Sequence, residues 1–139
     1  MRTFYAFRIN KELSILLSDT PYNLYRSLEN IYYMDKDKVS MGRDLLEQII
    51  SLIDIEKINK EIFQKNKDND FYTKIGSKHR IYNKYRNEET TIMVKKTHIL
   101  INTNTIPRNL INYLDMKDIF ICDFDNKDYF WLTKLFVKN

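Results

Sequence analysis

The sequence has 139 residues, the length of one ordinary domain, and 43% of them are hydrophobic, which excludes a chain that is disordered by composition. Lys and Arg number 23 against 19 Asp and Glu; this net charge of +4 is mixed along the chain, as on a solvated surface. The single Cys122 excludes an internal disulfide, and no apolar run is long enough to predict a signal peptide or a membrane span. We therefore expect one cytoplasmic domain over residues 1–139.

The first half of the sequence predicts one strand followed by helices. Residues 3–9 are rich in aromatic and β-branched side chains, as in a strand. Asn10 then suits a helix N-cap, and Pro21 suits the first position of a second helix. From Val39 to Ile53 apolar residues recur every three or four positions, which is the strongest helical pattern in the chain.

The same spacing predicts which way several side chains face. Leu16 is expected to face the core, whereas Leu13 and Leu17, four residues apart, share another face of the first helix. Leu45 belongs to the apolar stripe of the long helical pattern and is also expected in the core. Asp54 is placed to cap a further helix, which should end before a polar loop.

The second half of the sequence changes to the period of strands. Residues 90–95 and 97–102 predict two strands joined at a lysine-rich turn. A helix opening at Thr105 and Pro107 should follow, and then a final aromatic segment over residues 119–131. Strand and helices followed by hairpins predict an α+β fold, a single domain with an antiparallel or mixed β-sheet and helices packed on it.

Residues 119–131, IFICDFDNKDYFW, combine three aspartates with a cysteine and a tryptophan. A calcium loop that began at Asp123 would have Lys127 at a ligand position, which argues against a metal. General acid–base catalysis by carboxylates needs two of them close together, and the aspartates in and near this segment could supply such a pair. Residues 125–128 lie between two apolar runs, however, and their Asp and Asn side chains favour a turn that closes an aromatic hairpin.

The sequence contains no pattern typical of a catalytic or cofactor site. Gly42 and Gly76 are the only glycines, too few for a glycine-rich phosphate loop. Cys122, His79 and His98 lack the spacing of zinc ligands, and they could act as a nucleophile pair only if the fold brought them together. We therefore expect a binding protein without a cofactor, and keep an enzyme as the less favoured alternative.

Residues 71–86, FYTKIGSKHRIYNKYR, alternate cations with tyrosines. Aromatic rings can stack on bases while cations hold phosphates, so this segment could bind nucleic acid. On one alternating strand the cations would form a basic ladder on one side. A half-buried strand with lysine stems lying along it is the structural alternative.

Four short segments resemble, in the same order along the chain, sequences of the sporulation inhibitor of replication (SirA) family of Bacillus-type bacteria. These segments are FYAFRINKE, IYNKYR, TIMVKKTHILIN and DFDNKDYFWL. The resemblance covers nearly the whole length and implies one SirA-like domain. It implies a protein that acts without catalysis, by binding the N-terminal domain of the replication initiator DnaA and blocking initiation.

The resemblance also implies a partner-binding site on two helices. Matched by position, the site consists of Leu13 and Leu17 on the first helix and Leu45 and Gln48 on the long helix. The two first-helix positions are aromatic in the family and leucine here. A proline that follows the terminal Trp-Leu in the family is replaced here by Thr133–Lys134.

Overall fold

The computed structural model describes residues 1–105, 109–114 and 116–132. The first part of the chain forms, in order, β1 (Arg2–Arg8), α1 (Lys11–Leu16), α2 (Pro21–Tyr32), the 3-10 helix η1 (Lys36–Lys38), α3 (Val39–Ile49) and α4 (Ile55–Asn66). The second part forms β2 (Tyr72–Ile75), β3 (Lys78–Asn83), β4 (Glu88–Val94), β5 (Ile99–Thr103), α5 (Leu110–Tyr113), β6 (Ile119–Asp123) and β7 (Asp128–Trp131). The predicted Pro107 and the substituted Thr133–Lys134 lie outside the described residues.

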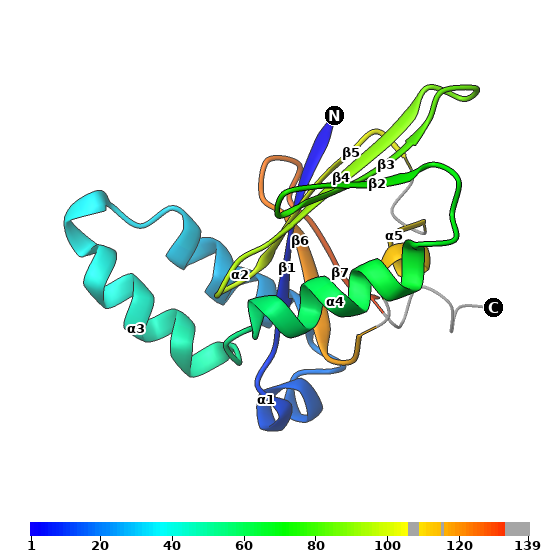
Figure 1. The fold of residues 1–139 in the computed structure, drawn as a ribbon. Coiled ribbons are helices and arrows are strands. Elements are labelled where there is room, and N and C mark those ends of the chain that lie inside the picture. The colour runs from blue at the N-terminus through cyan, green and yellow to red at the C-terminus, as the bar shows by residue number, and fades with distance from the viewer. Residues whose placement is uncertain (106–108, 115, 133–139) are drawn as a thin grey trace.

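The described strands make one seven-stranded antiparallel sheet in the order β2-β3-β4-β5-β1-β6-β7. The first strand of the chain therefore lies inside the sheet, where Phe4 pairs with Ile101 of β5 and Ala6 pairs with Ile121 of β6. Figure 1 shows α4 crossing one side of this sheet and the α2–α3 pair extending away from it. The predicted α+β fold with helices on a sheet is confirmed.

Each face of the sheet carries its own core. On one face, Ile58 and Ile62 of α4 pack on Phe4, Ile92 and other apolar side chains of the strands. On the other face, the buried side of α2 packs on the aromatic residues of β1, β6 and β7. None of the helices in the described part of the chain is long and apolar enough to cross a bilayer.

Several local predictions hold in the structure. Asn10 Oδ1 accepts a hydrogen bond from Glu12 N at 3.0 Å, and Asp54 Oδ1 accepts one from Lys57 N at 3.2 Å, so both residues cap helices. Pro21 is at the start of α2. The turn between β4 and β5 and the turn between β6 and β7 lie where the sequence predicts them.

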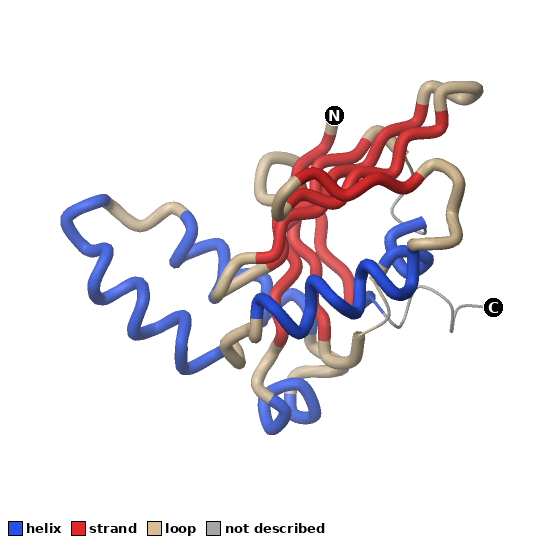
Figure 2. The backbone as a smooth tube through the Cα atoms, viewed as in Figure 1, coloured by secondary structure: helices blue, strands red, loops and turns tan. Residues whose placement is uncertain are grey.

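The boundaries of two segments in the structure differ from those that the sequence predicts. The long helical pattern ends at Ile49, because Ile50 leaves the helix in extended conformation and forms a β-bridge with Ile9. Residues 71–86 are a hairpin and not one strand, because the chain reverses at Gly76, whose φ of 61° suits glycine. In Figure 2 the second strand of this hairpin, β3, extends towards the upper right of the view together with β4.

Candidate protein-binding surface

Helix α1 is held in one orientation by a hydrogen bond to a distant loop. Ser14 is buried, and its Oγ donates to Asp118 Oδ1 at 2.8 Å. This contact turns Leu13 and Leu17 towards the sheet, where they are half-buried against the core. Leu16 is 73% exposed, so the prediction that it faces the core is wrong. The hydrogen bond joins residues 104 positions apart, which the helical spacing of leucines cannot reveal.

Helix α3 packs mainly on α2 and lies away from the sheet (Figure 1). Gly42 is its one buried residue, and a Cβ at this position would lie 3.2 Å from Met34 Sδ beyond the end of α2. The helix is fully covered at Gly42, whereas most of its other residues are exposed. Leu45 is 38% exposed, so the prediction that it lies in the core is wrong.

One uncovered stripe of α3 contains Met41, Leu45 and Gln48. These residues are four and three positions apart and therefore share one side of the helix. Met41 and Leu45 are exposed apolar side chains, and Gln48 is exposed as well. The adjacent stripe, which contains Leu46 and Ile49, is half-buried against the core.

The end of α3 and the start of α1 lie side by side. Asn10 N donates to Ile49 O at 2.8 Å, and Ile9 forms a bridge with Ile50. Leu13 and Leu17 of α1 pack on the same core cluster as Leu46 and Ile49 of α3. We call the joined area the helix surface; it consists of Leu13, Leu17, Met41, Leu45 and Gln48.

The residues that the resemblance implies lie on two helices and differ in exposure. Leu45 and Gln48 lie on its exposed part, whereas Leu13 and Leu17 form its half-buried part. Ile15 and Leu16, which the resemblance does not include, are 71% and 73% exposed on α1. Exposed apolar side chains are present on both helices, and a patch of such side chains is typical of a surface that another protein covers.

The residues considered for nucleophilic catalysis are not brought together. Cys122 of β6 lies in the core beneath α2, whereas His79 of β3 faces α4 on the opposite side of the sheet. His98 is on the same face as Cys122, but Tyr5 and Phe7 of the intervening β1 separate them. Burial raises the pKa of the Cys122 thiol, which keeps it protonated at neutral pH. The described residues contain no group of three His, Cys, Asp or Glu that could hold a metal.

His79 is fully buried and held by two polar partners. Its Nε2 is 2.8 Å from Asn59 Oδ1, and its Nδ1 is 2.7 Å from the Tyr72 hydroxyl. Because an amide oxygen only accepts, Nε2 carries the proton and Nδ1 accepts from Tyr72. Burial and the nearby charge of Lys74 lower the pKa of His79 to about 4. This arrangement is that of a neutral structural imidazole.

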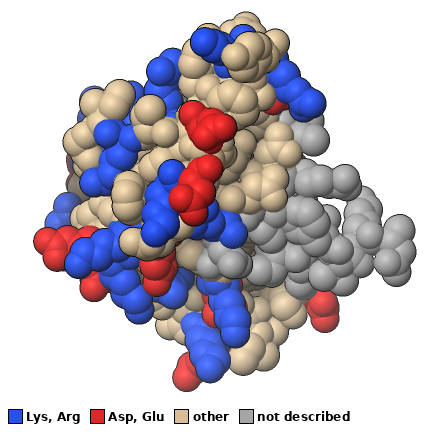
Figure 3. All heavy atoms as spheres, turned by 45° about the vertical axis from the view of Figure 1, so that its right-hand side comes forward, with Lys and Arg blue, Asp and Glu red and all other residues tan. Residues whose placement is uncertain are grey.

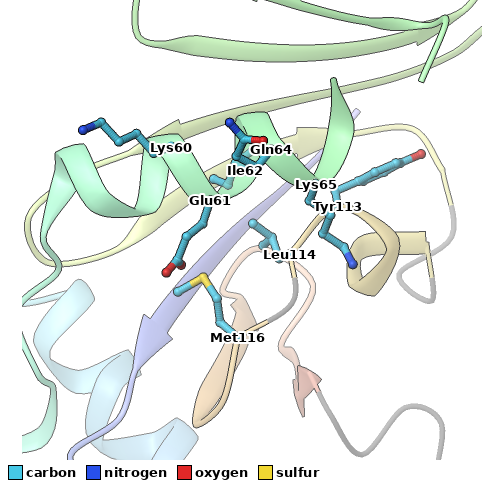
Figure 4. A pocket seen from close by; sticks show the side chains of 8 residues that line it. All are labelled: Lys60, Glu61, Ile62, Gln64, Lys65, Tyr113, Leu114 and Met116. Carbon is cyan, nitrogen blue, oxygen red and sulfur yellow. The ribbon is translucent and has the colours of Figure 1, made fainter. Parts of the chain in front are cut away.

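A hollow of about 400 Å³ lies between α4 and the side chains of Tyr113, Leu114 and Met116. Figure 4 shows Lys60, Glu61 and Lys65 projecting from α4 around it, with Leu114 and Met116 below the helix. Charges of both signs at its rim select neither an anion nor a cation. The described residues around the hollow therefore give no basis for a ligand, and we assign it none.

The cations of residues 71–86 do not form the predicted ladder. Lys74 pairs with His79 across the hairpin and lies on the α4 face, whereas Lys78 and Arg80 alternate onto the opposite face. Arg80 is already paired with Glu89 and lies over the ring of Tyr82. On the face in Figure 3, the Lys and Arg side chains of the described residues are interspersed with Asp and Glu. The hairpin at Gly76 therefore divides the basic residues that the sequence places together.

Residues 119–131 form the predicted hairpin, and Arg2 anchors its turn. Arg2 Nε donates to Asp123 Oδ2 at 2.9 Å, and Arg2 Nη2 donates to Asp128 Oδ2 at 2.8 Å. Burial opposes ionisation of Asp123, but hydrogen bonds from Asn126 and Arg2 outweigh it and lower the pKa of the carboxyl. The role of Arg2 was missed because it lies more than 120 positions away from its partners.

Comparisons with known proteins leave the role of the helix surface open. A scan against models of protein families finds no match to this sequence, and no curated protein matches it either. Support for a function therefore comes from the geometry of the helix surface and from the resemblance to the SirA family.

Proposed function

We propose that this protein acts by binding another protein through the helix surface, without catalysing a reaction. The observation that carries the proposal is the exposure of Met41 and Leu45 on a helix whose packing on α2 leaves that side uncovered. Interface cores are apolar and their rims are polar. Here the exposed leucine has charged neighbours on the same helix, among them Asp44 and Glu47.

We further propose that the partner is the N-terminal domain of the replication initiator DnaA, and that binding inhibits initiation in the cytoplasm. This step rests on the resemblance to the SirA family. In this arrangement Leu45 is an exposed anchor, Gln48 supplies a hydrogen-bonding side chain beside it, and Leu13 and Leu17 form the apolar floor on α1. A few apolar anchors provide most of the binding energy in such interfaces.

The proposal is tested by measuring binding of the initiator N-terminal domain from the same organism by calorimetry. The intact protein is expected to bind with a dissociation constant of about 10 µM or lower. Replacing Leu45 with Glu should weaken binding at least about tenfold, because a charge then replaces an apolar anchor. Folding should be unaffected, since Leu45 is already partly exposed.

Ile75→Glu is the matched control. Ile75 is 64% exposed on the edge strand β2, away from the helix surface, so this variant makes the same apolar-to-acidic change elsewhere. It should bind like the intact protein. The absence of binding by the intact protein, or equal losses in the Leu45 and Ile75 variants, would reject the proposal.

Leu13 and Leu17 are tested by substitution with alanine and not with a charged residue, because both pack on the core. Leu17→Ala should weaken binding and also lower stability, whereas Leu45→Glu should weaken binding alone. Nucleic-acid binding by residues 71–86 stays the alternative from another class. Their cations lie on both faces of the sheet, which gives this alternative less support.

A further inference from the structure

The β6–β7 turn presents one carboxylate that is free of partners. Asp123 and Asp128 are both bound by Arg2. Asp125 lies between them in the chain and is exposed, and among the described residues it has neither a hydrogen bond nor an ion pair. The turn therefore contains two structural aspartates and one whose charge is available.

The position of Asp125 is nevertheless well defined, because the turn around it is held on both sides. Asp123 Oδ1 accepts from Asn126 N at 3.2 Å, and Asp123 Oδ2 accepts from Asn126 Nδ2 at 2.7 Å. On the other side, Lys127 Nζ donates to the buried Glu29 Oε2 of α2 at 3.0 Å. A turn tied to β1 through Arg2 and to α2 through Lys127 holds its free carboxylate in one place.

Asp125 borders a small hollow at which three aromatic residues meet and whose exposed lining is mainly polar. The hollow has a volume of about 260 Å³ and is lined by Thr3, Tyr5, Tyr32, Phe124 and Asp125. The rings of Tyr32 and Phe124 stack with centroids 4.3 Å apart, and Tyr5 lies 5.3 Å from Tyr32 and 5.4 Å from Phe124. Three rings from three separate elements thus meet beside the free carboxylate.

The electrostatics of this hollow favour one sign of charge. Burial, a hydrogen bond with Tyr32 and the charge of Asp125 raise the pKa of Tyr5 to about 12, so its phenol stays neutral. Asp125 is then the one acidic group that lines the hollow. The Asp125 carboxylate and the phenol oxygens at the hollow attract a cation, and the exposed ring of Tyr32 adds a further attraction. Phe124 is buried and does not offer a ring face, because Tyr32 stacks on it.

We propose that this hollow, the Asp125 site, binds the cationic group of an organic molecule, an alkylammonium or a guanidinium. An anion would be repelled by Asp125, and a metal ion would require more oxygen ligands than one carboxylate and the hydroxyls nearby supply. The volume suits the end of one side chain or one small amine. The site is separate from the helix surface and does not depend on its function.

NMR titration tests the proposal on the intact protein, with the aromatic protons of Tyr5, Tyr32 and Phe124 as reporters. The probes are capped arginine amide, which represents a protein side chain, and butylammonium, which represents a free amine. Capped citrulline amide is the neutral counterpart of the arginine probe. At least one cation should give saturable shifts in the millimolar range, and the cation that binds more tightly identifies the source.

Two acidic positions provide the matched variants. Asp125→Asn should weaken cation binding at least about tenfold, whereas Asp68→Asn, which removes the same charge from an exposed loop after α4, should leave it unchanged. Tyr32→Leu should also weaken binding, because it removes one ring. Equal shifts with citrulline, equal binding by the Asp125 and Asp68 variants, or the absence of saturation with both cations would overturn the proposal.

Discussion

At the scale of single residues, His79 couples the stability of the fold to pH. The pKa of His79 is about 4 in the folded protein and 6.5 in the unfolded chain, so the unfolded chain binds a proton first as pH falls. The contribution of His79 to the free energy of unfolding is therefore fully present above pH 6.5. It is lost as pH falls towards about 4, and the loss is at most about 3 kcal/mol. Urea unfolding at a series of pH values measures the loss.

His79→Gln separates this residue from other titrating groups. A glutamine amide can donate to Asn59 and accept from Tyr72 without titrating, so the variant should lose the part of the pH dependence between pH 6.5 and 4.5 that His79 supplies. His98→Gln is the matched comparison: burial and Lys95 also lower the pKa of His98, so this variant should lose a separate part of the pH dependence. If the His79 variant keeps the full dependence, the buried imidazole is not its source.

At the scale of elements, the position of α3 depends on the absence of a side chain at Gly42. A Cβ there would already lie 3.2 Å from Met34 Sδ, so the larger Gly42→Val should push α3 away from α2. Overpacking of this kind destabilises a protein by about 1–3 kcal/mol, and the shift would also displace Leu45 and Gln48. Urea unfolding and binding of the initiator domain measure the two effects.

Gly42→Ala is the graded comparison for the same contact. The flexible end of Met34 can move by a few tenths of an ångström, and alanine favours a helix over glycine by about 1 kcal/mol. This variant should therefore be close to the intact protein in stability and binding. A Gly42→Val protein with unchanged stability would show that α3 does not pack tightly on α2.

At the scale of the whole molecule, the positive charge is dispersed, and we therefore expect no strong nucleic-acid binding. The net charge is +4, and the cations of residues 71–86 are divided between two faces of the sheet. A protein that contacts several phosphates loses affinity by orders of magnitude as salt rises from about 50 to about 200 mM. Binding of the initiator domain through apolar anchors should change less than about fivefold over this range.

Fluorescence anisotropy with labelled single-stranded DNA tests the nucleic-acid-binding alternative directly. We expect no saturable binding at about 150 mM salt, where a few dispersed cations hold little affinity. Lys78→Ala with Lys84→Ala is the informative pair if DNA does bind. A loss in that variant, with a steep salt dependence, would favour the nucleic-acid alternative over the helix surface.

Local interactions account for what the sequence by itself determined. The caps at Asn10 and Asp54 each depend on a backbone N–H two or three positions away. The turn predicted at residues 125–128, which the structure has at 124–127, depends on a short polar run between apolar ones. The alternation of Ile99 and Ile101 with Leu100 likewise follows from strand geometry. The α+β fold class follows from the order of such elements along the chain.

The tertiary structure alone decided which faces of those elements are covered. Ser14 turns α1 by bonding Asp118, which buries Leu13 and Leu17 partly and leaves Leu16 exposed, although all three leucines have helical spacing. Gly42 brings α3 onto α2, so an apolar stripe that resembles a core stripe remains open at Leu45. Asp125 differs from its two neighbouring aspartates because Arg2, from the other end of the chain, binds those two. Each outcome depends on a contact between distant residues, whereas periodicity records only that a side chain is apolar or charged.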